Sequence, residues 1–246
     1  MTRRCGSRVL AGSVAALTAY ALAGVAFAQS PAQPPAPPAP ATPVAPSAPA
    51  AAAPAALPGN PHRGKELSYT CLGCHGIDGY RNAYPDYSVP KLEGQNPQYL
   101  MDSLHGYRSG DRSHITMHSQ ASELSDQDIA DIAVFFAGKP LLSGGKPPAS
   151  IPKAATLCTS CHGQDGVAIA PMYPSLAGQH QDYLVRALEE YQNGGRKNPI
   201  MKALAAPLKP ADISEIAAYF SALTPALKTE PRPYTRLGAE QSGAEP

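Results

Sequence analysis

The sequence predicts an all-α protein built from two tandem copies of one small helical unit. Stretches of residues 71–136 return in the same order within residues 158–220, which indicates an internal duplication. Apolar residues in both copies recur three or four positions apart, the spacing of an amphipathic helix. No segment shows the convincing alternation of apolar and polar residues that marks a half-buried strand.

Length, charge and cysteine content narrow the function classes. The 246 residues suffice for one large domain or two small ones. A formal net charge of +1 gives neither the basic excess of a nucleic-acid-binding protein nor an acidic tail. Five cysteines are too few for a disulfide-dense scaffold, so their spacing matters more than their number.

Residues 1–28 are predicted to be a signal peptide. An arginine-rich start precedes an uncharged run over residues 9–26, and Ala26-Phe27-Ala28 is a small-x-small cleavage site. The alternative is an uncleaved N-terminal anchor, because a run of 18 residues forms a helix of about 27 Å, just short of a bilayer core. Cleavage would leave 17 basic and 19 acidic residues, a formal charge of −2.

Residues 29–58 contain 11 Pro and almost no apolar side chain larger than Ala, so they cannot form a core. We expect a disordered, extended Pro/Ala-rich linker of the polyproline type. The first copy of the unit follows as a domain over residues 59–147, and the second copy as a domain over residues 148–226. Residues 227–246 are predicted to be a polar C-terminal tail.

Three pairs of segments define the duplication. They are CLGCHGIDG (71–79) with CTSCHGQDG (158–166), PKLEGQNPQYL (90–100) with PSLAGQHQDYL (174–184), and LSDQDIADIAVFF (124–136) with LKPADISEIAAYF (208–220). The first pair is offset by 87 residues and the other two by 84, so the first copy carries three extra residues between them. The extra length falls in the segment RNAYPDYSV, residues 81–89.

Each copy is predicted to contain three short helices. The first helix enters the cysteine motif, over Pro61–Thr70 in one copy and Pro152–Thr159 in the other. The middle helix of the first copy begins after Asn96, and the last helix has Ser125 and Asp128 as a candidate N-cap pair. A unit this small buries little apolar surface, which favours disulfides or a large prosthetic group inside each copy.

Both copies carry a Cys-x-x-Cys-His sequence. Its residues are Cys71, Cys74 and His75 in the first copy and Cys158, Cys161 and His162 in the second. This spacing is the signature of c-type haem attachment. Two thiols three positions apart on one helical turn can each form a thioether with a haem vinyl group, and the adjacent histidine can ligate the iron. We therefore predict two haem c groups, covalently attached through thioether bonds.

Two other uses of these cysteines are weaker. A redox-active Cys-x-x-Cys pair would not need a histidine in both copies, and free pairs in an exported protein would tend to oxidise. A zinc site would need a fourth ligand and a partner pair at zinc-site spacing.

Met117 and Met201 are predicted to be the sixth iron ligands, because electron carriers commonly use Met or a second His there. The two methionines are equivalent, each seven residues before a leucine that precedes the last helix, in sequence that resembles a loop. The remaining candidates lack a counterpart in the other copy; they are Met101, Met172, His105, His114, His118 and His180. His62, His105 and His180 are expected to be surface histidines and not ligands. The carbonyls of Pro90 and Pro174 are candidates to accept the second ring N–H of each ligating histidine.

This combination of motifs, present twice over about residues 60–225, resembles the dihaem cytochromes of the c4 type. The resemblance implies two class I cytochrome c domains, each a small bundle of short helices around one covalently bound haem with His and Met on its iron. It also implies an electron carrier, not an enzyme, that works in the periplasm between a membrane reductase or dehydrogenase and a terminal oxidase.

Two alternatives remain open. The linker and tail suit a dihaem electron-accepting subunit of a larger dehydrogenase complex, or a protein associated with the membrane through its N-terminal segment. A dihaem oxidoreductase acting on peroxide or a sulfur compound would need an open or differently ligated iron, and two equivalent methionines disfavour this.

The two haems should differ in reduction potential. The first copy has 8 basic and 10 acidic residues, and the second has 6 of each. Because negative charge favours Fe(III), we predict the lower potential in the first copy.

Overall fold

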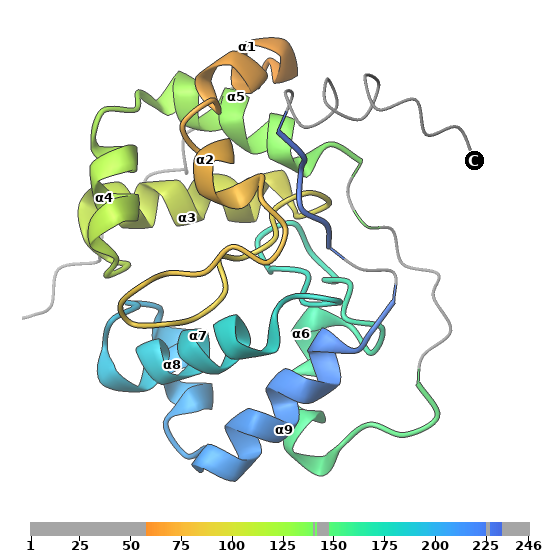
Figure 1. Ribbon diagram of the computed structural model, residues 1–246. Helices are drawn as coiled ribbons and strands as arrows, with labels where there is room; N and C mark the ends of the chain where they lie inside the picture. The colour runs from red at the N-terminus through yellow and green to blue at the C-terminus, as the bar shows by residue number, and fades with distance from the viewer. Residues whose placement is uncertain (1–57, 140, 142–147, 225–226, 233–246) are drawn as a thin grey trace, which may run out of the picture. The chain divides into compact units, whose positions relative to one another are not determined.

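The computed structural model describes residues 58–139, 141, 148–224 and 227–232, and helices are the main elements of these ranges (Figure 1). The first copy contains α1 (Pro61–Leu67), α2 (Leu72–His75), α3 (Pro97–Ser109), α4 (Ile115–Ser122) and α5 (Asp126–Ala137). The second copy contains the 3₁₀ turn η1 (Lys153–Ala155), α6 (Thr159–His162), α7 (Gln181–Asn193), α8 (Pro199–Ala205) and α9 (Pro210–Ser221). Bridges in the described part are isolated residue pairs, and the all-α prediction is confirmed.

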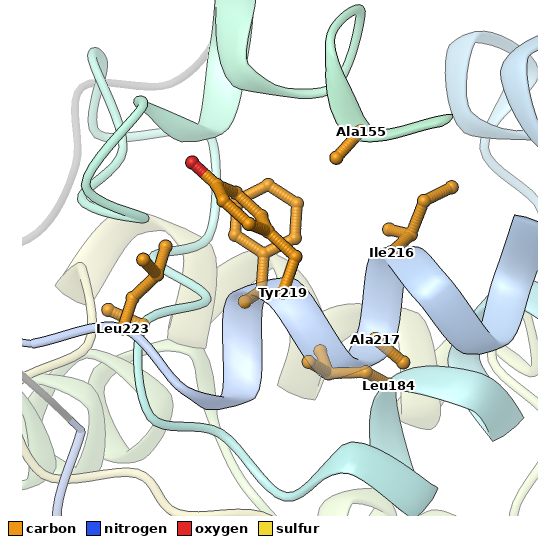
Figure 2. Close-up of a cluster of buried hydrophobic side chains, with 8 residues drawn as sticks. Ala155, Leu184, Ile216, Ala217, Tyr219 and Leu223 are labelled. Atoms are coloured by element: carbon orange, nitrogen blue, oxygen red, sulfur yellow. The ribbon is translucent and has the colours of Figure 1, made fainter. Parts of the chain in front are cut away.

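Each copy builds its core around its last helix. In the first copy α5 packs against α1 and α3, and α3 also packs against α4. In the second copy α9 packs against α7 and η1, and α7 packs against α8. Figure 2 shows the second core, where Ile216, Ala217 and Tyr219 of α9 lie among Leu184 of α7 and Ala155 of η1. The apolar residues that recur three or four positions apart in this helix therefore face the core.

The last helix of the first copy begins with the predicted N-cap pair. The Ser125 hydroxyl accepts from the Asp128 N–H at 3.2 Å, and the Asp128 carboxylate accepts from the Ser125 N–H at 2.9 Å. This reciprocal pair is a capping box, which satisfies two backbone donors that a helix start leaves free. The prediction is confirmed.

The predicted first helix forms in one copy and not in the other. α1 begins at Pro61, with the Asn60 side chain accepting the N–H groups of its first turn. The segment after Pro152 forms only the 3₁₀ turn η1, so the expected helix over Pro152–Thr159 is wrong. The reason is length, since Pro152 lies six residues before its motif and Pro61 lies ten residues before Cys71.

The methionine segments, expected to be loops, are the short helices α4 and α8. Met117 is the third residue of α4 and Met201 is the third residue of α8. Helix capping explains both helices, because His114 and Asn198 each accept a backbone N–H in the first turn. The expected loop is therefore wrong, although the two positions remain equivalent.

The extra segment of the first copy, residues 81–89, contacts the second copy. The Asp182 carboxylate at the start of α7 accepts from the Ser88 N–H and hydroxyl and from the Arg81 guanidinium, each at 2.9 Å. Burial raises the pKa of Asp182, but these donors outweigh it and lower that pKa below its ordinary value. The longer segment of the first copy thus joins the two copies.

Residues 227–232, which we call the C-terminal strap, pass from the second copy to the first (Figure 1). Leu227 is 1% exposed, and Lys228 exchanges backbone hydrogen bonds with Glu93 at 3.0 and 3.1 Å. The Arg232 guanidinium donates to the Leu72 carbonyl at 2.8 Å and to the Gly73 carbonyl. The start of the predicted polar tail is therefore packed beside the first cysteine motif.

The predicted signal peptide, the linker up to residue 57 and the tail from residue 233 lie outside the described residues. Within the described ranges, none of the helices combines the length and hydropathy that crossing a bilayer requires.

Candidate haem centres

The two cysteine motifs adopt the same local structure. Each occupies one helical turn, α2 or α6, with the first cysteine at the N-cap position. All four thiols, those of Cys71, Cys74, Cys158 and Cys161, are half-buried and unbridged. Cys71 and Cys158 pack against the cores of their own copies, so each motif lies at the edge of a hydrophobic core.

Both motif histidines are held by a proline carbonyl. His75 Nδ1 lies 2.9 Å from the Pro90 oxygen, and His162 Nδ1 lies 2.8 Å from the Pro174 oxygen. A carbonyl only accepts, so Nδ1 carries the proton and Nε2 of a neutral ring keeps its lone pair. Burial lowers the pKa of both histidines, which favours that neutral form. The expected acceptors are confirmed, and each ring is prepared to donate Nε2 to a metal.

The aromatic surroundings of the two histidines also match. The His75 ring meets Phe136 of α5 edge-on at 6.4 Å between centroids, and the His162 ring meets Phe220 of α9 at 6.3 Å. Phe136 and Phe220 are equivalent in the duplication and almost fully buried. Each last helix therefore fixes the ring in place from within the core.

The thiols are poor candidates for thiolate chemistry. Burial raises the pKa of Cys71 and of Cys158, whereas redox-active or zinc-binding cysteines need a lowered pKa. The described residues also include no cluster of three or more Cys, His, Asp or Glu side chains arranged to hold a metal ion.

His114 and Asn198 are functional counterparts although their side chains differ. His114 Nδ1 accepts from the Met117 N–H at 3.2 Å, and Asn198 Oδ1 accepts from the Met201 N–H at 3.0 Å. Each acceptor therefore fixes the backbone of the methionine predicted to be the sixth ligand. Histidine is outside the usual set of N-cap residues, so sequence alone did not reveal this equivalence.

The other candidate ligands are engaged elsewhere or exposed. His118 donates Nδ1 to the Tyr107 carbonyl at 2.7 Å, and His105 accepts from Arg108 at 2.9 Å. Met172 is 59% exposed, and Met101 packs against the first core. His62 is exposed, and His180 is the half-buried N-cap residue of α7.

Two equivalent arginines place charged groups against the interior and differ in how that charge is balanced. Arg196 is 5% exposed and pairs with Glu190 at 2.7 Å, whereas Arg112 has no carboxylate partner among the described residues. Arg112 lies over the Tyr107 ring at 4.8 Å, and its buried Nε finds no acceptor in the described part. Buried charges need counter-charges, and the two propionates of a haem are carboxylates of the required kind. The cysteines and histidines of both copies, together with Arg112 in the first copy, thus fit haem c. Arg112 and Arg196 are 84 residues apart, the offset of the duplication, so the sequence alone could have identified them as equivalent.

Comparisons with known proteins agree with this donor set. The family model described as cytochrome c matches residues 61–137 and 153–224, once in each copy. A cytochrome c4 from Pseudomonas aeruginosa is 36% identical over 186 residues, covering 67% of this chain and 89% of that relative. The chain belongs to the cytochrome c family, as a dihaem member of the c4 type. This c4-type cytochrome carries two covalently bound haem c groups and is an electron-transfer protein, not an enzyme.

Two further relatives bear on the function of this c4-type cytochrome. The solved cytochrome c4 of Acidithiobacillus ferrooxidans superposes with a TM-score of 0.53 at 31% identity, over 63% of this chain and 99% of that one. A thiosulfate dehydrogenase electron acceptor of Thiomonas intermedia is 38% identical over 113 residues, which cover 46% of this chain and 50% of that protein.

Proposed function

We propose that this chain carries electrons in the periplasm between a membrane reductase or dehydrogenase and a terminal oxidase. Its c4-type relatives support a dihaem electron carrier, and the predicted signal peptide supports export. The observation that carries the proposal is the mirrored geometry of the two centres, in which each motif histidine donates to a proline carbonyl and each candidate methionine is backbone-capped.

The ligand assignment is part of the proposal. Cys71 and Cys74 hold the first haem and Cys158 and Cys161 hold the second. His75 and Met117 ligate the first iron, and His162 and Met201 ligate the second. Haem c supplies reversible one-electron exchange between Fe(III) and Fe(II) at each centre. The chain holds Nδ1 of each histidine on a carbonyl, which keeps Nε2 basic and fixed while the charge of the centre changes.

A second candidate function keeps the same centres and changes the partner. In it the chain accepts electrons from a dehydrogenase that oxidises a sulfur compound, as the Thiomonas intermedia relative does by name for thiosulfate dehydrogenase. The Pro/Ala-rich segment over residues 29–58 suits a chain that stays tethered to such a complex.

Reduction kinetics separate these two functions. The oxidised holoprotein is mixed either with quinol-reduced membranes or with thiosulfate and a thiosulfate dehydrogenase, and haem reduction is followed by absorbance. We expect fast reduction by the membranes and reoxidation by a terminal oxidase. Fast reduction only by the dehydrogenase would establish the second candidate and contradict the first.

The N-terminus of the exported protein tests the localisation. We expect cleavage after Ala28 and recovery of the haem-containing protein in the periplasmic fraction. Retention of the uncleaved chain in the membrane fraction would instead support anchoring by residues 1–28. Limited proteolysis should cut within residues 29–58 and leave a fragment that begins near residue 59, as the proposed boundary between the linker and the first domain requires.

A further inference from the structure

Two glutamines at equivalent positions are almost fully buried. Gln95 and Gln179 end the repeated Pro-x-Leu-x-Gly-Gln segment, and each is 4% exposed. A buried primary amide costs free energy unless its donors and acceptor are satisfied, so its partners are informative.

Each glutamine binds the backbone of the other copy. Gln179 of the second copy accepts from the Lys91 N–H at 3.0 Å and donates to the Lys91 carbonyl at 2.9 Å. Gln95 of the first copy accepts from the Ser175 N–H at 2.8 Å and donates to the Ser175 carbonyl at 2.9 Å. The two contacts are mirror images across the duplication.

The orientation of both amides is determined by their partners. Each Oε1 also accepts the N–H of its own next residue, Asn96 at 2.9 Å or His180 at 3.0 Å. Two donors therefore face the oxygen and one acceptor faces the nitrogen, so a flipped amide would lose all three bonds.

The peptide that each glutamine holds is the one that holds a motif histidine. The Pro90 carbonyl and the Lys91 N–H belong to a single peptide group, which accepts from His75 on one side and donates to Gln179 on the other. The Pro174–Ser175 peptide joins His162 to Gln95 in the same way. An unbroken chain of hydrogen bonds thus runs from each histidine to a side chain of the opposite copy.

We propose that Gln95 and Gln179 are positioning residues, each of which sets the reduction potential of the haem in the opposite copy. An acceptor on the peptide N–H polarises the carbonyl, because hydrogen bonds in a chain strengthen one another. A stronger carbonyl acceptor makes the histidine a more basic ligand, which stabilises Fe(III). The inference rests on the proposed ligation by His75 and His162.

Removing one glutamine should therefore raise the potential of the haem across the interface. Only the part of that hydrogen bond's free energy that differs between Fe(III) and Fe(II) changes the potential, so the whole bond sets an upper limit of roughly fivefold in the Fe(III)/Fe(II) equilibrium. For a one-electron couple this limit is about 40 mV, at 59 mV for each tenfold change.

The test compares Gln179→Leu and Gln95→Leu in the full holoprotein. The two potentials are followed by NMR during a redox titration, with signals of each haem assigned from the Met117→Ala and Met201→Ala variants. Gln179→Leu should raise the reduction potential of the first haem, and Gln95→Leu should raise that of the second. A larger shift in the haem of the mutated copy, or equal shifts in both, would mean that the glutamines act only as packing and would overturn the proposal.

A second pair of variants covers the case in which leucine prevents assembly. Gln179→Glu and Gln95→Glu keep an oxygen acceptor for both N–H groups and can add negative charge. We expect each to lower the potential of the opposite haem, opposite in sign to leucine; no shift, or a rise, contradicts the inference. Failure of the proposed ligation is separately visible, because the unmodified protein would then lack the low-spin signature of His and Met on both irons.

Discussion

The two copies keep the same geometry at their motif histidines and differ in the segments that lead into the motifs. The histidine-to-proline distances are 2.9 and 2.8 Å in the two copies. The first copy enters its motif through the helix α1, and the second copy enters through a single 3₁₀ turn. The site is therefore preserved by the motif, the proline carbonyl and the last helix, and not by the segment that leads into it.

A buried carboxylate anchors the entry helix α1 of the first copy. Asp131 of α5 is 1% exposed and accepts from the Asn60 N–H at 2.7 Å and from the Arg63 guanidinium at 2.5 Å. Gly64 allows this close approach, because a Cβ there would clash with the Asp131 carbonyl. The equivalent residue of α9, Glu215, is exposed.

The largest expected effect comes from removing one proposed methionine ligand at a time. Met117→Ala should change the spin state and lower the potential of the first haem alone, by at least about 60 mV or tenfold in equilibrium. Met201→Ala should do the same to the second haem. Absorbance and electron paramagnetic resonance of the purified variants check this, and low-spin signals from both haems in either variant would refute the assignment.

The next largest effect compares the segments that lead into the two cysteine motifs, through equivalent residues of α5 and α9. Asp131→Ala should lower the free energy of unfolding by about 2–3 kcal/mol, because it leaves the Asn60 N–H and Arg63 without their buried acceptor. The matched change Glu215→Ala should cost less than about 0.5 kcal/mol. Urea unfolding of the holoproteins measures both, and equal losses would show that Asp131 has no special role.

The loss of unfolding free energy in Asp131→Ala, relative to the unmodified protein, should depend on pH. Burial raises the pKa of Asp131, but bonds from Asn60, Arg63 and Gln127 outweigh it and lower that pKa below its ordinary value of 3.8. A carboxyl with a lowered folded pKa stabilises the fold above its unfolded pKa and loses that effect as pH falls. The difference in the free energy of unfolding between the unmodified protein and Asp131→Ala should therefore narrow as the pH falls below about 4. A difference that widens toward low pH would contradict this.

A smaller effect tests the equivalence of His114 and Asn198. His114→Ala and Asn198→Ala each remove one N-cap and should destabilise the local helix by about 1 kcal/mol. His114→Asn should restore most of the loss, because asparagine caps the second copy in the same position. Amide hydrogen exchange in α4 and α8 measures this, and no rescue would mean that His114 acts differently.

Features of the fold and of the candidate site were predictable from the sequence where they depend on residues close together in the chain. The cysteine motifs, the capping box at Ser125 and the paired methionines depend on spacing along the chain, and they were recognisable. The helix α4 was missed because His114 is an unusual cap, and the failed helix after Pro152 was a matter of available length. The contacts of Gln95 and Gln179 depend on how the copies pack together, which no local pattern encodes.

The smallest effect concerns charge added to the first copy by the C-terminal strap. With residues 227–232 included, the first copy has 10 basic and 11 acidic residues. Its net charge is then closer to that of the second copy, which has 6 of each. Arg232→Gln should lower the first potential by roughly 20 mV or less, about twofold, and leave the second unchanged. Spectroelectrochemical titration measures both, and a rise in the first potential would contradict the predicted sign.

Haem content and ligation of the purified mature protein test the central claim most directly. Mass spectrometry counts the haems bound to each chain, and absorbance with electron paramagnetic resonance reports the ligands of each iron. The account predicts two covalently attached haems, both low-spin with His and Met ligation and together taking up two electrons. A chain with one haem or none, or with a five-coordinate high-spin iron, would contradict it.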